Sequence, residues 1–392
     1  MKTVELQQVT TIIAGQSPES STYNSIADGL PFFQGKADFQ DKFPKVRVWC
    51  NSVKRKNAIP GDILMSVRAP VGSVNICNQK CIIGRGLSAI RSHSNLNNYF
   101  LYYYLKCNEK KVASLGTGST FQAITQTTLK RLEIPLPPLD DQIRIATLLS
   151  KVENLISRRR EQLRQLDELL KSVFLEMFGD PVRNEKGWDI LPFHQVGHFV
   201  SGGTPSKKRA DYWDGNFPWV SPKDMKVSKI EDAEDHIAES VFEETTLKRI
   251  TPNHLLIVVR GMILVHSFPV AINTVDIAIN QDIKAIKPIQ RLNVVYLQSC
   301  INALKRKILK LISTAGHGTR KFDSIAMHKL YIPTPPIDLQ NQFADIAEKF
   351  EGIKSRYQQS LKEFENLYGI LSQKAFKDEL DLSRVPTACR RG

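Results

Sequence analysis

The residues that could carry catalysis do not form a known catalytic pattern. A base methyltransferase needs a polar residue, two prolines and an aromatic residue in succession, but the two Pro-Pro pairs stand in "LPPL" and "TPPI". The stretch "SGGTPSKK", which begins at Ser201, lacks the Gly-Lys-Ser/Thr ending of a phosphate loop, and "GTGS" at Gly116 does not open a βαβ unit. No HExxH, GxSxG or paired-carboxylate nuclease pattern is present. The sequence therefore predicts that this chain is not an enzyme.

The histidines and cysteines do not predict a metal site. Cys77 and Cys81 are the only near pair among six cysteines, and no histidine or second cysteine pair stands at zinc-site spacing. We expect reduced thiols in a cytoplasmic protein. The sequence has no run of about 18 apolar residues, and its start, "MKTVELQQVTTII", lacks the form of a signal peptide, so no membrane association is predicted.

The positive charge is unevenly distributed. The chain holds 54 basic and 40 acidic residues, a net charge of +14. Residues 1–133 hold 17 basic and 8 acidic side chains and residues 181–331 hold 21 and 15, whereas residues 134–180 hold 7 and 8 and residues 332–392 hold 9 and 9. A polyanion such as nucleic acid is the natural partner of two such basic segments. A soluble basic protein without that partner remains the alternative.

An internal duplication explains the two neutral segments. "LEIPLPPLDDQ" at Leu132 returns 198 positions later as "LYIPTPPIDLQ" at Leu330, and 16 of the 49 pairs from Leu132–Asp180 and Leu330–Asp378 are identical. Repeats of this length indicate repeated structural units. The prolines impose an extended entry, and the aspartate that follows them suits the first turn of a helix.

A long amphipathic helix is predicted after each proline run. Apolar residues recur at 4–3 spacing through five heptads, which is typical of a coiled-coil seam. The first helix should span about 37 residues, or roughly 55 Å. We expect the two helices to pair with each other, the alternative being separate partners or a second chain. The predicted seam residues are Leu149, Val152, Ile156, Leu163, Leu166 and Leu170 in the first helix and Phe350, Tyr357, Leu361, Phe364 and Tyr368 in the second. Arg159 and Lys354 at mid-seam positions are expected to snorkel or to set the register.

The basic segments are duplicated more weakly. "LQQVTTIIAGQSP" at Leu6 corresponds to "FHQVGHFVSGGTP" at Phe193, "PGDILMSVR" at Pro60 to "PNHLLIVVR" at Pro252, and "IGRGLSAI" at Ile83 to "INQDIKAI" at Ile279. Short Val-, Ile- and Phe-rich runs broken by Gly, Pro and Asn predict strands and turns, with one helix near residues 98–111 and another near 294–312.

These patterns predict an α+β fold with a pseudo-two-fold internal repeat. Two globular domains are separated by two long antiparallel coiled-coil helices. The predicted segments are domains at 1–133 and 181–331, spacer helices at 134–180 and 332–380, and a flexible tail at 381–392. Because the two halves differ in sequence, a DNA site read by both should have two different halves.

The doubled "IPxPPxxxQ" entry (Ile134–Gln142 and Ile332–Gln340) resembles the specificity (S) subunit of type I restriction–modification enzymes. The resemblance extends from about Val4 to Asp378 and includes the "GGTP" loop at Gly202 and "NQD" at Asn280. The first domain departs from it, with "AGQSP" at Ala14 and "GRG" at Gly84, so no base specificity is transferred.

The resemblance implies a non-catalytic DNA-recognition subunit with no cofactor of its own. Each domain would read one half of a bipartite, asymmetric site in double-stranded DNA, and the helices would set the spacing and dock two methyltransferase (M) subunits. Restriction (R) subunits would complete the complex. S-adenosylmethionine, ATP and Mg²⁺ would be used by these partners.

Loop cations and amides are the candidate DNA contacts. Lys and Arg can bind phosphates, while Arg, Asn and Gln can also read base edges. The candidates are Gln34, Lys36, Arg68, Arg85 and Ser119 in the first domain and Lys207, Lys208, Lys223, Arg260, Arg320 and Lys321 in the second. Arg68 and Arg260 follow predicted strands and could instead form structural ion pairs. For the whole chain, the alternatives are a coiled-coil scaffold with non-specific DNA binding and a self-contained methyltransferase.

Overall fold

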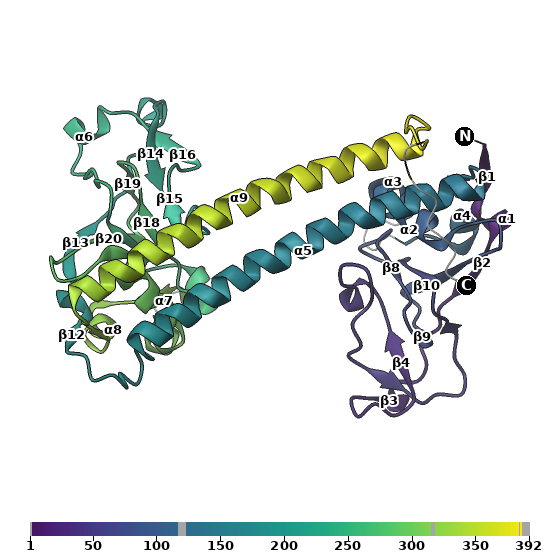
Figure 1. Cartoon of the computed structure of the whole chain (residues 1–392), viewed down its shortest axis with the longest axis horizontal. Helices are drawn as coiled ribbons and strands as arrows, with labels where there is room; N and C mark the ends of the chain where they lie inside the picture. The colour runs from purple at the N-terminus through teal and green to yellow at the C-terminus, as the bar shows by residue number, and fades with distance from the viewer. Residues whose placement is uncertain (1, 117–122, 315–317, 384, 386–392) are drawn as a thin grey trace. The chain divides into compact units, whose positions relative to one another are not determined.

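Two helices of 40 residues run through the structure, α5 (Leu139–Phe178) and α9 (Ile337–Phe376) (Figure 1). The computed structural model describes residues 2–116, 123–314, 318–383 and 385. The chain divides into two compact units, and each long helix contributes to both. Unit 1 comprises Met1–Arg160 and Gln359–Gly392, and unit 2 comprises Glu161–Gln358. Each unit therefore contains segments of both repeats.

Unit 1 contains two sheets. The first runs in the order β2 (Thr10–Ala14), β10 (Leu87–Ser92), β7 (Ile63–Ser66) and β8 (Val74–Ile76), all antiparallel. The second runs β3 (Tyr23–Asn24), β5 (Trp49–Cys50), β4 (Leu30–Phe33), β9 (Cys81–Ile83) and β6 (Asn57–Ala58), with β4 and β9 parallel. A short ribbon joins β1 (Thr3–Glu5) to β11 (Glu133–Pro135). The helices are α1 (Leu6–Val9), α2 (Asn98–Cys107), α3 (Glu109–Ser114) and α4 (Gln126–Lys130).

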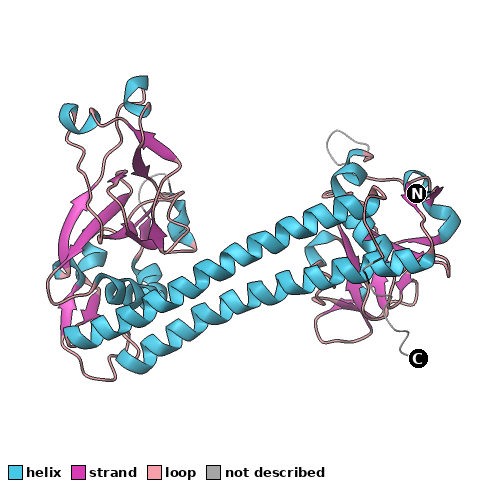
Figure 2. Ribbon diagram, turned by 45° about the horizontal axis from the view of Figure 1, so that its top comes forward, coloured by secondary structure: helices cyan, strands magenta, loops and turns pink. Residues whose placement is uncertain are grey.

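Unit 2 repeats this plan. Its main sheet runs β13 (Gly197–Ser201), β20 (Ile283–Pro288), β17 (Leu255–Val258), β18 (Val270–Asn273) and β15 (Lys229–Ile230). A second sheet runs β16 (Asp235–Ile237), β14 (Phe217–Val220) and β19 (Ala278–Ile279), and ribbons join β12 (Ile190–Pro192) to β23 (Tyr331–Pro333) and β21 (Ser313–Thr314) to β22 (Arg320–Lys321). The helices are α6 (Val241–Glu244), α7 (Val294–Leu311) and α8 (Ser324–His328). The mixture of helices and sheets in both units confirms the predicted α+β class (Figure 2).

The helices predicted before each repeat are confirmed as α2 and α7. Each begins at an asparagine N-cap: the Asn97 side chain accepts from the Phe100 backbone N (3.0 Å), and the Asn293 side chain accepts from the Val295 backbone N (2.9 Å). Such caps satisfy backbone donors that have no partner within the helix. Both helices bury most of one face against the main sheet of their unit.

The glutamine of each "IPxPPxxxQ" entry is a buried joint. The Gln142 side chain accepts from the Asn97 N (2.7 Å) and donates to the Asn95 O (3.1 Å) and the Pro137 O (2.9 Å). Gln340 makes the same three bonds, with Asn293 N (2.9 Å), Arg291 O (3.0 Å) and Pro335 O (2.8 Å). Because a buried amide must satisfy all its polar atoms, the motif fixes the first turn of each long helix against the loop before α2 or α7.

The long helices pack antiparallel. In unit 2, Lys354 Nζ lies 2.8 Å from Asp167 Oδ1, and the rings of Phe174 and Phe343 are 5.4 Å apart. In unit 1, Arg160 Nη2 lies 2.7 Å from Glu365 Oε1. In unit 2, rising residue numbers on α5 therefore meet falling numbers on α9.

The predicted seam residues all lie on inward-facing or partly covered positions. Leu149, Val152 and Ile156 are buried, and the other eight are half-buried. The mid-seam cations have structural partners: the Arg159 guanidinium is 5.9 Å from the Phe364 ring centre, and Lys354 also lies 3.2 Å from Glu351. Both contacts fit the predicted snorkelling role.

Four residues of the predicted tail are described, 381–383 and 385. Leu382 packs on the core of unit 1, and its carbonyl accepts from Arg144 Nη1 (3.5 Å).

In the described ranges, no helix combines the length and apolarity needed to span a membrane.

Candidate nucleic-acid interface

Both units contain the same arrangement of loops at the place where strands of the main sheet end. In unit 1 the Val67 N donates to the Gly86 O (2.9 Å), and the Ile124 N donates to the Val67 O (3.0 Å). The same two bonds recur in unit 2 among Val259, Asp282 and Phe322, at 2.8 and 2.9 Å. We call these places the sheet corners. They are formed by the residues after β2 and β7 and before β10 in unit 1, and after β13 and β17 and before β20 in unit 2.

A glycine is required at each sheet corner by close backbone approach. A Cβ atom on Gly15 would stand 2.1 Å from the Gly84 O, and a Cβ on Gly202 would stand 2.0 Å from the Ile279 O. The duplicated glycines of "AGQSP" and "SGGTP" thus let one loop pass directly over the turn that precedes the central strand. The loop position, and with it the side chains around it, is fixed by the backbone.

The sheet corner of unit 2 carries side chains held by internal acceptors. Arg260 Nε donates to Asp282 Oδ1 (2.6 Å), and Lys284 Nζ donates to Ser201 Oγ (2.8 Å). The Thr204 hydroxyl donates to Gln281 Oε1. Arg260, Gln281, Lys284 and Lys321 line a cavity of ≈ 400 Å³. The arrangement presents several hydrogen-bond donors to one exposed hollow.

The sheet corner of unit 1 carries two arginines. Arg68 follows β7 and Arg85 lies in the turn before β10, and both line a cavity of ≈ 220 Å³ together with Gly15 and Gln126. Both side chains are exposed. Where unit 2 has Asp282, unit 1 has Gly86, so the acceptor that orients Arg260 has no counterpart beside Arg68.

The other predicted contacts lie in different settings. Lys207 and Lys208 are exposed on the loop after Pro205, and Gln34 is exposed beside Gly86, whose added Cβ would meet the Gln34 O at 2.2 Å. Lys321 is exposed and pairs through its backbone with Arg260. Ser119 lies outside the described residues.

Three predicted cations have intramolecular partners. Lys223 Nζ lies 2.9 Å from Asp235 and 3.1 Å from Glu234, and hydrogen bonds to these carboxylates raise its pKa. Lys36 Nζ lies 3.6 Å from Glu109. Arg320 is half-buried and donates to Thr314 Oγ1 (2.6 Å). Because a carboxylate partner partly neutralises a cation, Lys223 and Lys36 are weaker candidates for phosphate contacts, whereas the Thr314 hydroxyl leaves the charge of Arg320 unchanged.

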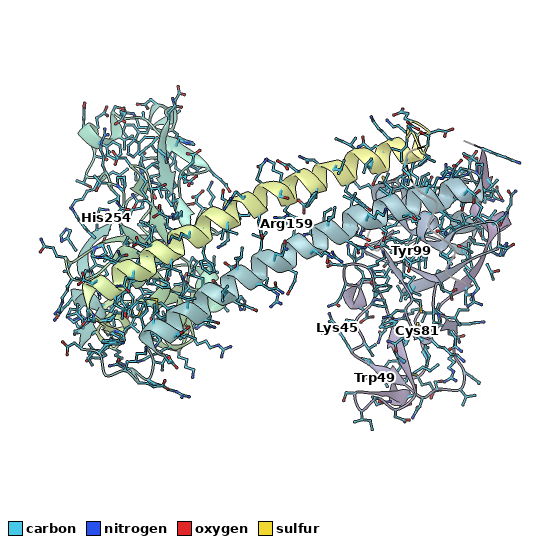
Figure 3. All side chains as sticks on the ribbon, in the orientation of Figure 1. Lys45, Trp49, Cys81, Tyr99, Arg159 and His254 are labelled. Atoms are coloured by element: carbon cyan, nitrogen blue, oxygen red, sulfur yellow. The ribbon has the colours of Figure 1, made fainter. Side chains whose placement is uncertain are left out.

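Histidine and cysteine have packing roles. Cys77 and Cys81 are buried with their Sγ atoms 3.5 Å apart, and buried His254 has Nδ1 2.7 Å from the Thr251 O; Cys81 and His254 are labelled in Figure 3. Within residues 2–116, 123–314, 318–383 and 385, no group of three or more His, Cys, Asp or Glu could hold a metal ion.

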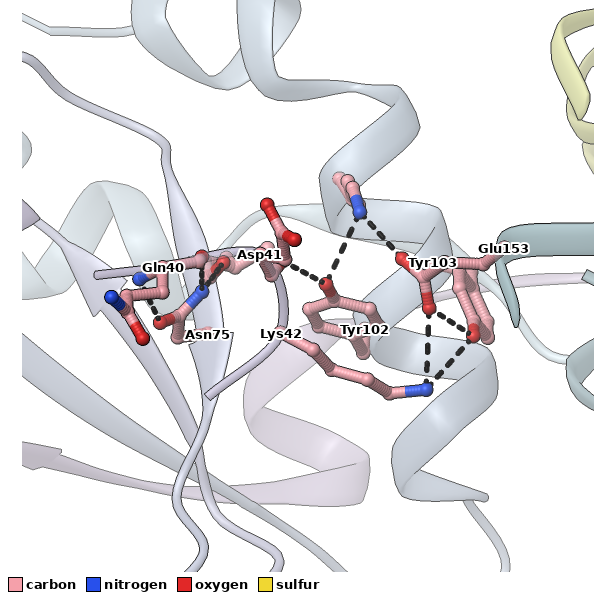
Figure 4. Close-up of polar contacts among 9 residues, drawn as sticks. Gln40, Asp41, Lys42, Asn75, Tyr102, Tyr103 and Glu153 are labelled. Carbon is pink, nitrogen blue, oxygen red and sulfur yellow. Dashed lines mark hydrogen bonds and ion pairs between the residues drawn. The ribbon is translucent and has the colours of Figure 1, made fainter. Parts of the chain in front are cut away.

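A second polar site, not predicted from the sequence, lies within unit 1 and connects α2 to the first part of α5. Glu153 accepts from Lys106 Nζ (2.6 Å) and from the Tyr103 hydroxyl (2.8 Å), and Lys42 Nζ lies 3.2 Å away (Figure 4). Burial alone would raise the pKa of Glu153, but Lys106, Tyr103 and Lys42 outweigh it and hold the pKa below its ordinary value. The cluster ties α2 and the loop at Lys42 to the long helix.

Unit 2 has a related contact at the equivalent repeat position. Glu351 lies 198 residues after Glu153 and is within 3.5 Å of Ser228 Oγ and 3.2 Å of Lys354 Nζ. The identity of Glu153 and Glu351 in the repeat was the available signal for both sites. Except for Lys354, three residues from Glu351, the partners could not be inferred because they come from loops and helices far away in sequence.

Gln281, Lys284 and Thr204 are the corner residues that the sequence analysis did not select. Gln281 aligns with Arg85, which was selected, so the repeat offset itself was the signal. Lys284 and Thr204 gain their relevance only from pairing of β13 with β20, which places Ser201 opposite Lys284.

Comparison with known proteins gives one consistent similarity. The model of a family described as "Type I restriction modification DNA specificity domain" matches residues 1–166 and 185–364. The MjaX specificity subunit of Methanocaldococcus jannaschii is 44% identical over 163 residues, 41% of this chain and 38% of that relative. The EcoR124I/EcoR124II specificity subunit of Escherichia coli is 28% identical over 268 residues, 67% of this chain and 65% of that relative. The aligned part thus spans less than two thirds of either relative.

Solved structures show the same fold. A type I restriction–modification S subunit from M. genitalium superposes with a TM-score of 0.61 at 17% identity, covering 96% of both chains. A chain from a study of complex assembly and conformational transition of the type I R-M system superposes with a TM-score of 0.57 at 18% identity, covering 97% of this chain and 98% of that one.

Proposed function

Because the chain belongs to the family of type I restriction–modification DNA specificity subunits, we propose that it is the DNA sequence-recognition subunit of such a complex. It acts without catalysing a reaction, and unit 1 and unit 2 each read one half of a bipartite, asymmetric site in double-stranded DNA. Two methyltransferase subunits use S-adenosylmethionine, and restriction subunits use ATP and Mg²⁺. The complex works in the cytoplasm.

The duplicated sheet corner is the observation that carries this proposal. One backbone arrangement occurs in both units, held by matching hydrogen bonds and by Gly15 and Gly202. Arginine is kept at the aligned positions Arg68 and Arg260, whereas Arg85 in unit 1 aligns with Gln281 in unit 2. A repeated scaffold with different polar side chains is what two different half-sites require.

The charged side chains divide into two roles. Exposed lysines such as Lys207, Lys208 and Lys321 supply sequence-independent phosphate contacts. The arginines and the glutamine at the sheet corners supply contacts to base edges. The helices α5 and α9 contribute to both units, and they set the spacing of the half-sites and dock the methyltransferase subunits.

Domain replacement tests the modular part of the proposal. Residues 1–133 are exchanged for the corresponding segment of a related specificity subunit, and methylated adenines are mapped in cells that also express the partner subunits. We expect one half of the methylated motif to change and the other half to stay. A change in both halves contradicts the assignment of one half-site to each unit.

A salt titration separates sequence recognition from a scaffold with non-specific DNA binding. The assembled complex is titrated against duplexes with the mapped motif and with a scrambled motif. A recognition subunit gives a large affinity ratio between them, on the order of a thousandfold or more, on top of a steep salt dependence. Equal curves for both duplexes support the scaffold. Binding of S-adenosylmethionine by the purified chain alone would support a self-contained methyltransferase instead.

A further inference from the structure

The sheet corner of unit 2 holds two side chains in fixed positions with unused hydrogen-bonding groups. Arg260 donates to Asp282 through Nε, at 2.6 Å, and within the described residues the two terminal nitrogens of its guanidinium make no hydrogen bond. Gln281 accepts from the Thr204 hydroxyl through Oε1, which leaves its amide NH₂ and a second lone pair on Oε1. Both side chains line the same ≈ 400 Å³ hollow.

The remaining groups match purine edges. Two terminal guanidinium nitrogens can donate together to guanine O6 and N7, and a glutamine amide can donate to adenine N7 while accepting from adenine N6. A cation that only neutralises phosphate does not need an orienting carboxylate. Asp282 reduces the net charge of the corner but fixes the plane of the Arg260 side chain, and this favours base reading over phosphate binding.

Exposure at the site suits contact with a duplex. The Arg260 side chain retains 47% of its accessible surface, whereas its partner Asp282 retains 23%. Gln281 and Thr204 are both exposed. Lys321, whose backbone pairs with that of Arg260, lies beside the pair as a phosphate contact.

We propose that Arg260 and Gln281 are the base-reading pair of unit 2, that they read purines, and that Asp282 and Thr204 are their positioning residues. This inference rests on the proposed function, because it presupposes that unit 2 reads a half-site. It goes further in naming the readers, the class of base and the groups that orient the readers. The equivalent place in unit 1 has Gly86 in place of Asp282, so Arg68 there reads DNA without that support.

The test measures base preference position by position. The full chain, assembled with its methyltransferase subunits, selects duplexes from a library randomised across the site, and the bound pool is sequenced. Gln281→Glu keeps the oxygen that accepts from Thr204 but replaces the donor by an acceptor. Arg260→Lys keeps the positive charge but loses the planar guanidinium, which can donate two parallel hydrogen bonds to one base. We expect each variant to lose about tenfold to a hundredfold of the discrimination at one position of one half-site, with the other half-site unchanged.

The positioning residues have a matched pair of substitutions. Thr204→Ser keeps the hydroxyl and should retain the adenine preference, whereas Thr204→Val removes it and should lose preference at the same position as Gln281→Glu. Arg306→Ala, an exposed change on α7 outside the corner, is the control and should leave the selected sequences unchanged. Thermal unfolding of each variant checks that the fold is retained.

The outcomes separate the two levels of the proposal. If the unaltered complex selects no sequence, the proposed function fails. If it selects a sequence and the Gln281 and Arg260 variants select the same one, the function stands and the base-reading pair is overturned. Equal weakening on all sequences would make these residues phosphate contacts and would also overturn the pair.

Discussion

Glu153 shows how one half-buried side chain can hold a recognition domain to its helix. Its carboxylate contacts Lys106 and Tyr103, which come from α2, and Lys42, which comes from the segment between β4 and β5. The side chain is only 18% exposed. A carboxylate with two cations and a hydroxyl around it is stable there because its neighbours compensate for the lost water.

Glu153→Gln should lower the stability of unit 1 by about 2 kcal/mol at neutral pH, because Lys42 and Lys106 then lose their counter-charge. The pKa of Glu153 is below its ordinary value in the folded state. Its contribution is therefore present above the ordinary pKa of glutamic acid and is lost as the pH falls through the lowered one. Urea unfolding of both proteins across the acid range should show the difference shrinking. A difference that stays constant with pH would contradict the charge-based account.

Single residues were the hardest part to predict from the sequence. Gln142 and Gln340 stood out as an identical pair, but two of the three partners of each lie 45 to 49 positions earlier and become neighbours only in the fold. Lys223 was selected as a candidate DNA contact, but its ion pair with Asp235 on β16 was not predicted, because it depends on the pairing of β14 with β16. The sequence predicted that Arg260 follows a strand, but it did not show that Asp282 would be the acidic residue beside it.

At the scale of elements, each sheet corner depends on the loop that crosses it. Gly202→Ala should displace this loop, because the new Cβ would stand 2.0 Å from the Ile279 O, an unyielding backbone atom. We expect DNA binding by the assembled complex to weaken about tenfold or more while most of the fold is kept.

Gly203→Ala is the matched control for this change. Its Cβ would meet only Leu247 Cδ1, at 3.6 Å, an ordinary van der Waals distance. Fluorescence anisotropy with a labelled specific duplex compares the two variants. Equal affinity for both would mean that the loop position does not govern DNA binding.

The helix seam makes a prediction of its own. Leu361 is half-buried on α9, whereas Leu367 on the same helix is 41% exposed. Leu361→Asp should destabilise the helix pair by about 2 kcal/mol, because the half-buried position removes the new carboxylate from part of its water, and should impair assembly with the methyltransferase subunits. Leu367→Asp should be close to neutral for folding. Circular dichroism melting and co-purification measure the two effects, and equal behaviour of both variants would argue against the seam.

The elements themselves were largely predictable because their signals are local. Heptad spacing predicted a first helix of about 37 residues, and both observed helices are 40 residues long, since they begin directly after the proline run at Leu139 and Ile337. The five-residue helices α4 and α8 were not predicted, because one turn leaves no periodicity. The division into two sheets depends on pairing between distant strands, such as β4 with β9.

For the whole molecule, the duplication and the division into units do not coincide. Unit 1 takes Gln359–Gly392 from the second repeat, and unit 2 takes Glu161–Asp180 from the first. The core of unit 1 includes Ala375, which is fully buried, with Tyr368 and Leu371 packed against it. Each recognition domain is thus completed by helix residues that belong to the other repeat.

This interleaving predicts how the chain behaves when it is cut between the repeats. A fragment of residues 1–180 lacks Ala375 and its neighbours and exposes Phe174 and Phe178, which are buried in unit 2 of the intact chain. We expect it to self-associate when expressed alone and to form a 1:1 complex when co-expressed with residues 181–392, because only that partner restores both helix pairings. Light scattering after gel filtration gives the stoichiometry, and the intact chain is the control. A stable monomer of residues 1–180 that melts at the temperature of the intact chain would show that the unit folds without the second repeat.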